Sequence, residues 1–176
     1  MSNKYFYKDG LESSRLFTRF LTLEDIEIWT EFMKDEESIQ FIPVFEVLDV
    51  HGKTKAWIER QMFRYSEKIC GLQALIHKET NDFIGQCGLL TQEVNGKIEI
   101  EVGYHIFKQY RGQGFATEAA KLFIDFAFNN NLTNSVISII DIRNLKSQRV
   151  AEKNGLNKER QTTWGNLEVL IYRIEK

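Results

Sequence analysis

The sequence predicts one α+β domain built on a single central sheet. Segments with strand and helical periodicity follow in the order strand, two helices, antiparallel strands, a β-α-β crossover, then a helix and strands. No Pro/Gly/Ser-rich linker, internal repeat or charge block divides the 176 residues, which is the length of one domain. We therefore expect residues 1–176 to fold as one unit.

The first part of the chain is predicted to form a strand and two helices. Residues 16–20 have the pattern of a short strand, and a helix starts at Thr22 with Asp25 as its capping-box partner. Residues 39–50 are apolar and predicted to be irregular. A second helix is predicted over residues 53–68, where large apolar side chains recur at helical spacing.

The remaining elements begin with an antiparallel meander. Residues 72–77 are expected to pair with 83–90, and the Asn95-Gly96 turn leads into a strand over 98–107. Five elements follow a glycine loop: a helix over 116–130, a strand over 135–141, a helix over 144–154 that ends at Gly155, and strands over 156–163 and 167–174.

Composition limits the classes of function. The net charge is −2 and the pI is near 6, so no basic surface for nucleic acid or anionic membrane is expected. The first residues lack the apolar core of a signal peptide, and no apolar run has the length of a membrane span. Cys70 and Cys87 lack CxxC spacing and are expected to be buried free thiols. These features fit a cytoplasmic protein.

The segment with the strongest functional signal is the glycine loop over residues 109–114. A β-rich strand precedes it and an unbroken helix-forming run follows it. Glycines let the backbone approach a ligand closely, and the free N–H groups at a helix start favour phosphate. The loop therefore predicts a site for a phosphorylated ligand.

Two common phosphate-binding patterns do not fit this loop. A P-loop needs an adjacent lysine and hydroxyl residue directly after its last glycine, and this segment lacks that pair. A Rossmann fingerprint needs a third glycine where Thr117 stands, and antiparallel strands precede this loop. The glycines could also serve only to close a tight strand-to-helix connection.

A third pattern fits the loop and its neighbours. Gln109-x-x-Gly112-x-Gly114 resembles the pyrophosphate motif Q/R-x-x-G-x-G/A of the GNAT acetyltransferase superfamily. Further segments resemble its RimJ/RimL-like branch in the right order: residues 12–19 and 22–25, 83–88, 101–104, 111–119 and 144–156. The resemblance covers most of the chain.

The resemblance implies a GNAT-like acyl-CoA N-acyltransferase fold. Its central sheet would be mixed and mostly antiparallel, flanked by helices, with acetyl-CoA lying where the parallel strands 98–107 and 135–141 splay apart. By resemblance, backbone N–H groups of the loop hold the pyrophosphate and the pantetheine arm runs along the first of these strands. The implied donor-binding residues are His105, Ile106, Gln109, Arg111, Gly112, Gln113, Gly114, Ala116, Thr117 and Asn144.

Glu101 is the candidate general base. Acetyl transfer to an amine needs a neutral nucleophile, and Glu101 precedes the cleft on the strand that would carry the thioester. The base could act directly or through water. The alternative is a solvated strand residue, because Glu93, Glu99 and Glu101 would share one face at a period of two. By resemblance, the Ile106 amide would stabilise the oxyanion.

Ser147 is the candidate partner of the leaving thiolate. Many family members have a tyrosine four residues before the glycine that ends this helix, but here Ala151 stands there. Ser147 lies one turn earlier on the same face, and RimJ/RimL-like enzymes resemble this arrangement. The alternative is an exposed helix serine; Tyr104 and Tyr110 are weaker substitutes. His105 could be a second base or a structural residue.

The acceptor is left open by the sequence. By family analogy, the aromatic stretch 41–45 and the second helix would line its side of the cleft. Protein N-terminal amines, polyamines, amino sugars and small drug amines all fit. A donor with a longer acyl chain is a further alternative, which the volume near Ile106 and Ile139 would decide.

The leading hypothesis is an acetyl-CoA-dependent N-acetyltransferase that works by direct transfer in a ternary complex. The alternative is a catalytically silent acyl-CoA-binding module on the same fold. No metal is expected, because the three histidines are isolated and lack ligand spacing. Domains of this kind often dimerise through sheet edges or terminal strands, so a homodimer is compatible with the sequence.

Overall fold

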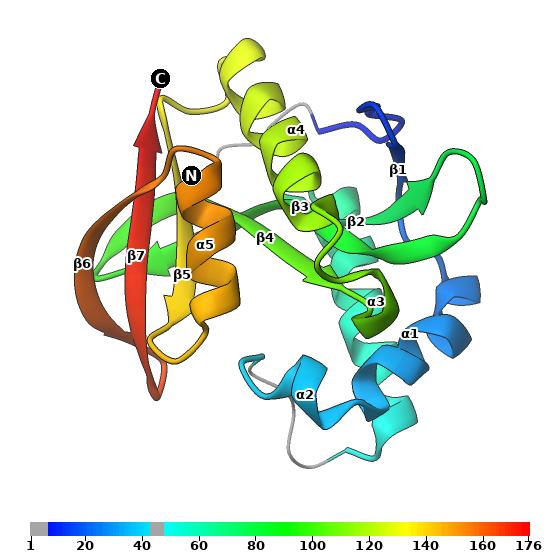
Figure 1. Cartoon of the computed structure of the whole chain (residues 1–176). Coiled ribbons are helices and arrows are strands. Elements are labelled where there is room, and N and C mark those ends of the chain that lie inside the picture. Colours follow the sequence, from blue (N-terminus) through cyan, green and yellow to red (C-terminus); the bar gives the residue numbers. More distant parts are fainter. Residues whose placement is uncertain (1–6, 43–47) are drawn as a thin grey trace.

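Seven strands form one mixed sheet in the order β1-β2-β3-β4-β5-β7-β6 (Figure 1). The computed structural model describes residues 7–42 and 48–176. The strands are β1 (Leu16–Arg19), β2 (Cys70–His77), β3 (Phe83–Val94), β4 (Lys97–Ile106), β5 (Ser135–Asp141), β6 (Asn157–Trp164) and β7 (Leu167–Glu175). The helices are η1 (Leu23–Asp25), α1 (Ile26–Lys34), α2 (Glu36–Ile39), α3 (Val50–Ser66), η2 (Lys108–Tyr110), α4 (Phe115–Asn129) and α5 (Leu145–Lys153).

The sheet is antiparallel except at its centre, where β4 and β5 run parallel. Their recorded register is limited to Glu101 opposite Ile137. Beyond that pair the two strands diverge toward their carboxyl ends (Figure 1). The predicted mixed sheet with a splayed parallel pair is thereby confirmed.

Helices cover both faces of the sheet. In Figure 1, α4 and α5 lie in front of it and α3 lies behind it. The front core contains Phe123 of α4 with Val102 and Val136 of the central strands. The rear core centres on Trp29 of α1 and Ile58 of α3, both fully buried. Each such side chain contributes about 1.5–3 kcal/mol by leaving water, and together the two layers hold the central strands rigidly.

Several local predictions are confirmed. The Thr22 N–H donates to the Asp25 carboxylate at 2.8 Å, as in half of a capping box. Asn95 and Gly96 form the two-residue turn between β3 and β4, both with positive φ. Gly155 follows the end of α5 with φ +81°. Cys70 and Cys87 are buried free thiols.

Three predictions need correction. The predicted irregular stretch 39–50 is too long at both ends, because Ile39 still belongs to the short helix α2 and Val50 already begins α3. The second strand of the meander extends past residue 90 to Val94, since it continues into the hairpin. Glu93 lies opposite Ile98, so it faces away from Glu99 and Glu101.

In the described parts of the chain, no helix is both long and apolar enough to cross a membrane.

Candidate active site

The glycine loop and the start of α4 gather seven of the predicted donor-binding residues. They are Gln109, Arg111, Gly112, Gln113, Gly114, Ala116 and Thr117. Gly112 and Gly114 have φ values of +77° and +83°, a conformation that disfavours side chains. No side chain caps α4, and its first main-chain bond within the helix is Glu118 N–H to the Gly114 carbonyl. The Arg111 N–H already bonds to the Lys108 carbonyl at 3.2 Å, whereas the N–H groups of residues 112–117 remain available to an anion.

Arg111 points its side chain away from this loop. Its Nε donates to the Ile106 carbonyl at 3.0 Å, and its Nη2 bonds to Ser38 Oγ in α2. The Arg111 side chain therefore braces the end of β4 and does not point into the glycine loop.

The edge of β4 exposes main-chain groups to the gap that opens between β4 and β5. The Phe107 N–H bonds back to the Ile84 carbonyl of β3. Along a strand the main-chain N–H groups point alternately to one neighbouring strand and the other. The N–H groups of Tyr104 and Ile106 therefore face away from β3 and toward the gap between β4 and β5. On the other side of the gap, Asn144 Oδ1 accepts the Ser147 N–H at 3.1 Å and so caps α5.

Glu101 lies at the point where the splay begins. Its side chain is 8% exposed, so it is not the solvated residue of the alternative interpretation. Gln92 Nε2 donates to its Oε2 at 2.8 Å, and the Ile139 N–H donates to its Oε1 at 3.2 Å. Burial raises the pKa of Glu101 to about 7, although these two bonds and the charge of Arg64 act against that rise. A carboxyl group with this pKa can exchange a proton near neutral pH.

Tyr104 and Ser147 meet on the opposite face of β4. The Tyr104 hydroxyl lies 3.0 Å from Ser147 Oγ and donates to the Ser147 carbonyl at 3.0 Å. Residues 101 and 104 on one strand point to opposite faces, so this hydroxyl pair lies on the α4/α5 side and Glu101 on the α3 side. Ser147 is thus half-buried and held in place, unlike an exposed helix serine.

His105 packs its ring on the α3 side, between Phe32 and Trp57, at centroid distances of 6.1 and 5.3 Å. Burial, with a smaller contribution from the Arg111 charge, lowers the pKa of His105 to about 4. The imidazole is therefore neutral near pH 7. The side chain belongs to an aromatic cluster, and its main chain lies along β4.

Sequence reasoning missed Gln92, which holds Glu101 from β3. It named Tyr104 only as a weaker substitute for Ser147, whereas the hydroxyl of Tyr104 lies 3.0 Å from that of Ser147. The sequence could have predicted that Gln92 lies near Glu101 only if the register of the β3–β4 hairpin had been known. On the acceptor side, Phe41 lies against Arg143, while Pro43, Val44 and Phe45 fall outside the described residues.

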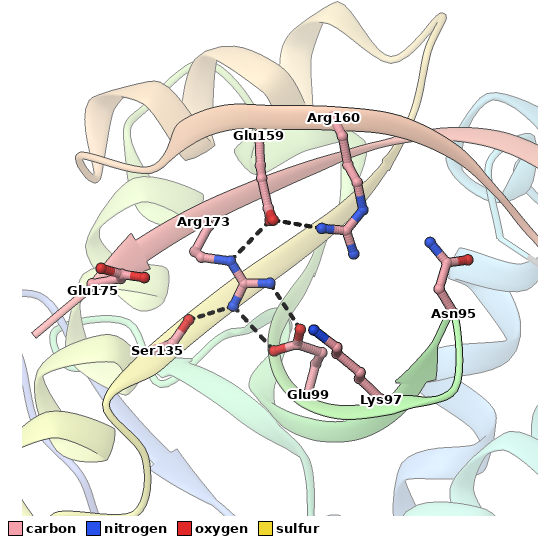
Figure 2. Close-up of a pocket in the computed structure, with 8 residues that line it drawn as sticks. All are labelled: Asn95, Lys97, Glu99, Ser135, Glu159, Arg160, Arg173 and Glu175. Carbon is pink, nitrogen blue, oxygen red and sulfur yellow. Dashed lines mark hydrogen bonds and ion pairs between the residues drawn. The ribbon is translucent and has the colours of Figure 1, made fainter.

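A polar pocket of about 450 Å³ lies at the other end of the β4–β5 pair (Figure 2). Arg173 of β7 forms its floor and bonds to Glu99, Glu159 and Ser135 of three other strands. All three guanidinium nitrogens of Arg173 are bonded, so the cluster acts as a brace. It holds the strands together at the closed end and leaves the gap at the end near the loop.

The family model of the acetyltransferase (GNAT) domain matches residues 15–157. The matched region includes the glycine loop, Glu101 and Ser147. The protein is therefore an acetyltransferase of the class that uses acetyl-CoA. The chain belongs to the GNAT family.

Relatives and solved structures agree with this assignment. An uncharacterized N-acetyltransferase, p20, of Bacillus licheniformis is 27% identical over 175 residues, 96% of this chain and 97% of that protein. The crystal structure of an acetyltransferase from Agrobacterium tumefaciens has a TM-score of 0.82 at 24% identity, covering 100% of this chain and 99% of that one. RimL, a ribosomal L7/L12 α-N-protein acetyltransferase in complex with coenzyme A, has a TM-score of 0.77 at 13% identity, covering 93% and 95%. The two structures share the fold.

Proposed function

We propose that this protein transfers the acetyl group of acetyl-CoA to a primary amine by direct attack within a ternary complex. The donor occupies the α4/α5 side of the splay. Main-chain N–H groups of residues 112–114 and of Ala116, with Thr117 nearby, hold its pyrophosphate. The Arg111 N–H, expected from the sequence to join them, bonds to the Lys108 carbonyl instead. The pantetheine arm lies along Tyr104, His105 and Ile106 and reaches the Asn144 side chain. The coenzyme A complex of RimL supports a donor of this kind.

The proposal rests mainly on one observation. Glu101 lies on one face of β4, and Ser147 of α5 lies against the other face, where β4 and β5 begin to separate. The amine approaches from the α3 side and the thioester from the α4/α5 side. Their reacting atoms can therefore meet between the strands without either substrate crossing the sheet. This arrangement favours direct transfer over a covalent enzyme intermediate.

Each proton then has an assigned route. Glu101 accepts a proton from the ammonium, directly or through water, and the free amine attacks the carbonyl carbon. The Ile106 N–H stabilises the oxyanion that forms. The attacked nitrogen then loses its second proton as the C–S bond breaks, and the Ser147 hydroxyl relays a proton to the thiolate, which leaves as coenzyme A. The proton that Glu101 accepted passes to solvent, which restores the base. The products are an acetylated amine and the free thiol.

The acceptor is a protein N-terminal amine or a small-molecule amine. Trp57 and His105 form its aromatic border on the α3 side, and the buried carboxylate of Glu101 attracts a cationic group. The negative net charge of the chain favours cationic substrates in general.

Release of the coenzyme A thiol tests this proposal. The assay combines acetyl-CoA with peptides bearing free N-termini, polyamines, amino sugars and small drug amines. Thiol release that depends on one of these amines, with mass-spectrometric detection of its acetylated product, supports it. Tight binding of acetyl-CoA with no turnover on any amine class would instead favour the silent acyl-CoA-binding module.

A further inference from the structure

The segment before β1 contacts the loop that precedes α4. Arg15 Nη1 donates to the Gln113 carbonyl at 3.0 Å, and the Arg15 guanidinium lies 4.2 Å from the Phe115 ring centroid. A β-carbon added to Gly114 would lie 3.5 Å from Arg15 Nη2. Arg15 therefore contacts Gln113 and Phe115, and lies beside Gly114, at the junction of the loop and the helix, 98 or more positions away in sequence.

Glu118, in the first turn of α4, holds Arg15 in this position. Its Oε2 accepts Arg15 Nε and Nη2, each at 2.7 Å, as a two-pronged ion pair. Its Oε1 accepts the Arg15 N–H at 2.8 Å and the hydroxyls of Ser13 and Ser14 at 2.7 and 2.9 Å. The carboxylate thus receives five donors, and the guanidinium has one orientation.

The bond to Gln113 determines where the next amide points. A peptide unit is planar and trans, so the C=O of Gln113 and the N–H of Gly114 point in opposite directions. Gly114 has no Cβ, so the peptide unit between Gln113 and Gly114 can rotate when nothing holds it. With the carbonyl tied to Arg15, the Gly114 N–H is directed away from Arg15, toward the loop's inner surface.

We propose that Arg15 and Glu118 are a positioning pair that pre-forms the pyrophosphate-binding loop. The inference rests on the proposed function, because it assigns a role only if this loop binds coenzyme A. Arg15 acts through the backbone and does not touch the donor. A preorganised loop binds its ligand more tightly, since the cost of ordering the glycines has been met during folding.

Calorimetric and NMR titrations of coenzyme A and pantetheine test the pair. Pantetheine shares the arm but lacks the phosphates. Arg15→Met should weaken coenzyme A binding at least about tenfold, the effect of losing a charged hydrogen bond, and leave pantetheine binding unchanged. Arg15→Lys keeps a charge near Glu118 but lacks the second prong for Gln113, so it should weaken coenzyme A binding in the same direction. If Arg15→Met does not fold, the affinities of Arg15→Lys for coenzyme A and pantetheine provide the test.

Arg19→Met is the matched control. Arg19 lies on β1 and makes a two-pronged pair with the buried Asp25, at 2.9 and 2.7 Å, away from the loop. It should leave coenzyme A affinity within about twofold of the unmodified protein. Wild-type affinity in both Arg15 variants, or an equal loss for coenzyme A and pantetheine, would overturn the inference. Failure of the unmodified protein to bind coenzyme A would instead refute the proposed function.

Discussion

The main-chain N–H of Ile139 on β5 donates a hydrogen bond to the Glu101 carboxylate on β4, 3.2 Å away. The register pairs Glu101 with Ile137, so this bond lies two residues further along β5 than the paired position. A side chain therefore bridges the strands where they begin to part. The charge of Glu101 affects both the sheet and the proposed chemistry, and the two effects can be measured separately.

Glu101→Gln should lower kcat/KM about 100- to 10,000-fold, because it removes the proposed base. In the unmodified enzyme, kcat/KM should rise with pH through about 7, since the base acts only when its carboxyl is ionised. The variant should lose that limb of the pH–rate profile. Glu93→Gln is the control, because Glu93 faces the other way from β3. An unchanged profile in Glu101→Gln would remove Glu101 as the base.

Gln92→Leu should move the same limb to higher pH while leaving the plateau rate near that of the unmodified enzyme. The Gln92 amide bonds to the ionised form of Glu101, so its loss raises the pKa of Glu101. The pH–rate profile measures this shift, and a titration of the Glu101 carboxyl by carbon NMR measures it without turnover. A limb that stays in place or moves down would show that the bond does not tune the base.

Glu101→Gln should also stabilise the fold at alkaline pH. Burial raises the folded pKa of Glu101 to about 7, above the unfolded value of about 4.3. Its contribution to stability is therefore complete below about pH 4.3 and is lost as the pH rises through 7. At pH 8 the variant should gain a few kcal/mol in unfolding free energy, and near pH 4 the gain should vanish. Urea unfolding at both pH values checks this, and an equal difference at both would contradict it.

Ser147→Ala should lower kcat about 10- to 100-fold without changing the affinity for coenzyme A. The leaving thiolate then lacks its hydroxyl donor. Tyr104→Phe should have a smaller effect on kcat, because it removes the group that orients the Ser147 hydroxyl and leaves that hydroxyl present. Ser66→Ala, at the exposed end of α3, is the control. A wild-type kcat in Ser147→Ala would assign protonation of the thiolate to water.

Gly112→Ala should abolish tight coenzyme A binding at a small cost in stability. A methyl group there meets no atom within 4 Å, so the cost comes from a left-handed φ of +77° and amounts to about 1 kcal/mol. Gly96→Ala is a close match, with φ +75° and the same open surroundings in the β3–β4 turn. Both variants should lose similar stability, but only Gly112→Ala should lose affinity, by at least about tenfold. Equal affinities of the two variants for coenzyme A would contradict the assignment of this loop as the pyrophosphate-binding site.

Local signals explain why so much of the fold was predictable. The Asn95-Gly96 turn, the glycine after α5 and the glycine loop before α4 depend on residues next to one another in the chain. Their conformational preferences survive in any packing. The short helix α2 was missed because four residues carry no period.

Pairs of distant residues were not predictable. Gln92 with Glu101, Tyr104 with Ser147, and Arg15 with Glu118 are joined by strand register and helix packing, which no local pattern encodes. The expectation that Glu93 shares a face with Glu99 and Glu101 was wrong for the same reason, since a hairpin turn lies between Glu93 and Glu99.

Local sequence patterns were enough to predict the family, the acetyl-CoA donor and the loop proposed to hold it, because that loop is a contiguous segment with its own backbone preferences. Packing between distant segments buries Glu101, lets its carboxylate bridge β4 and β5, and places Ser147 on the opposite face of β4, and none of this can be inferred from local patterns. Burial and hydrogen bonding set the pKa of a carboxyl group, and both depend on which segments pack together. The chemistry of the base is therefore a property of the assembled sheet.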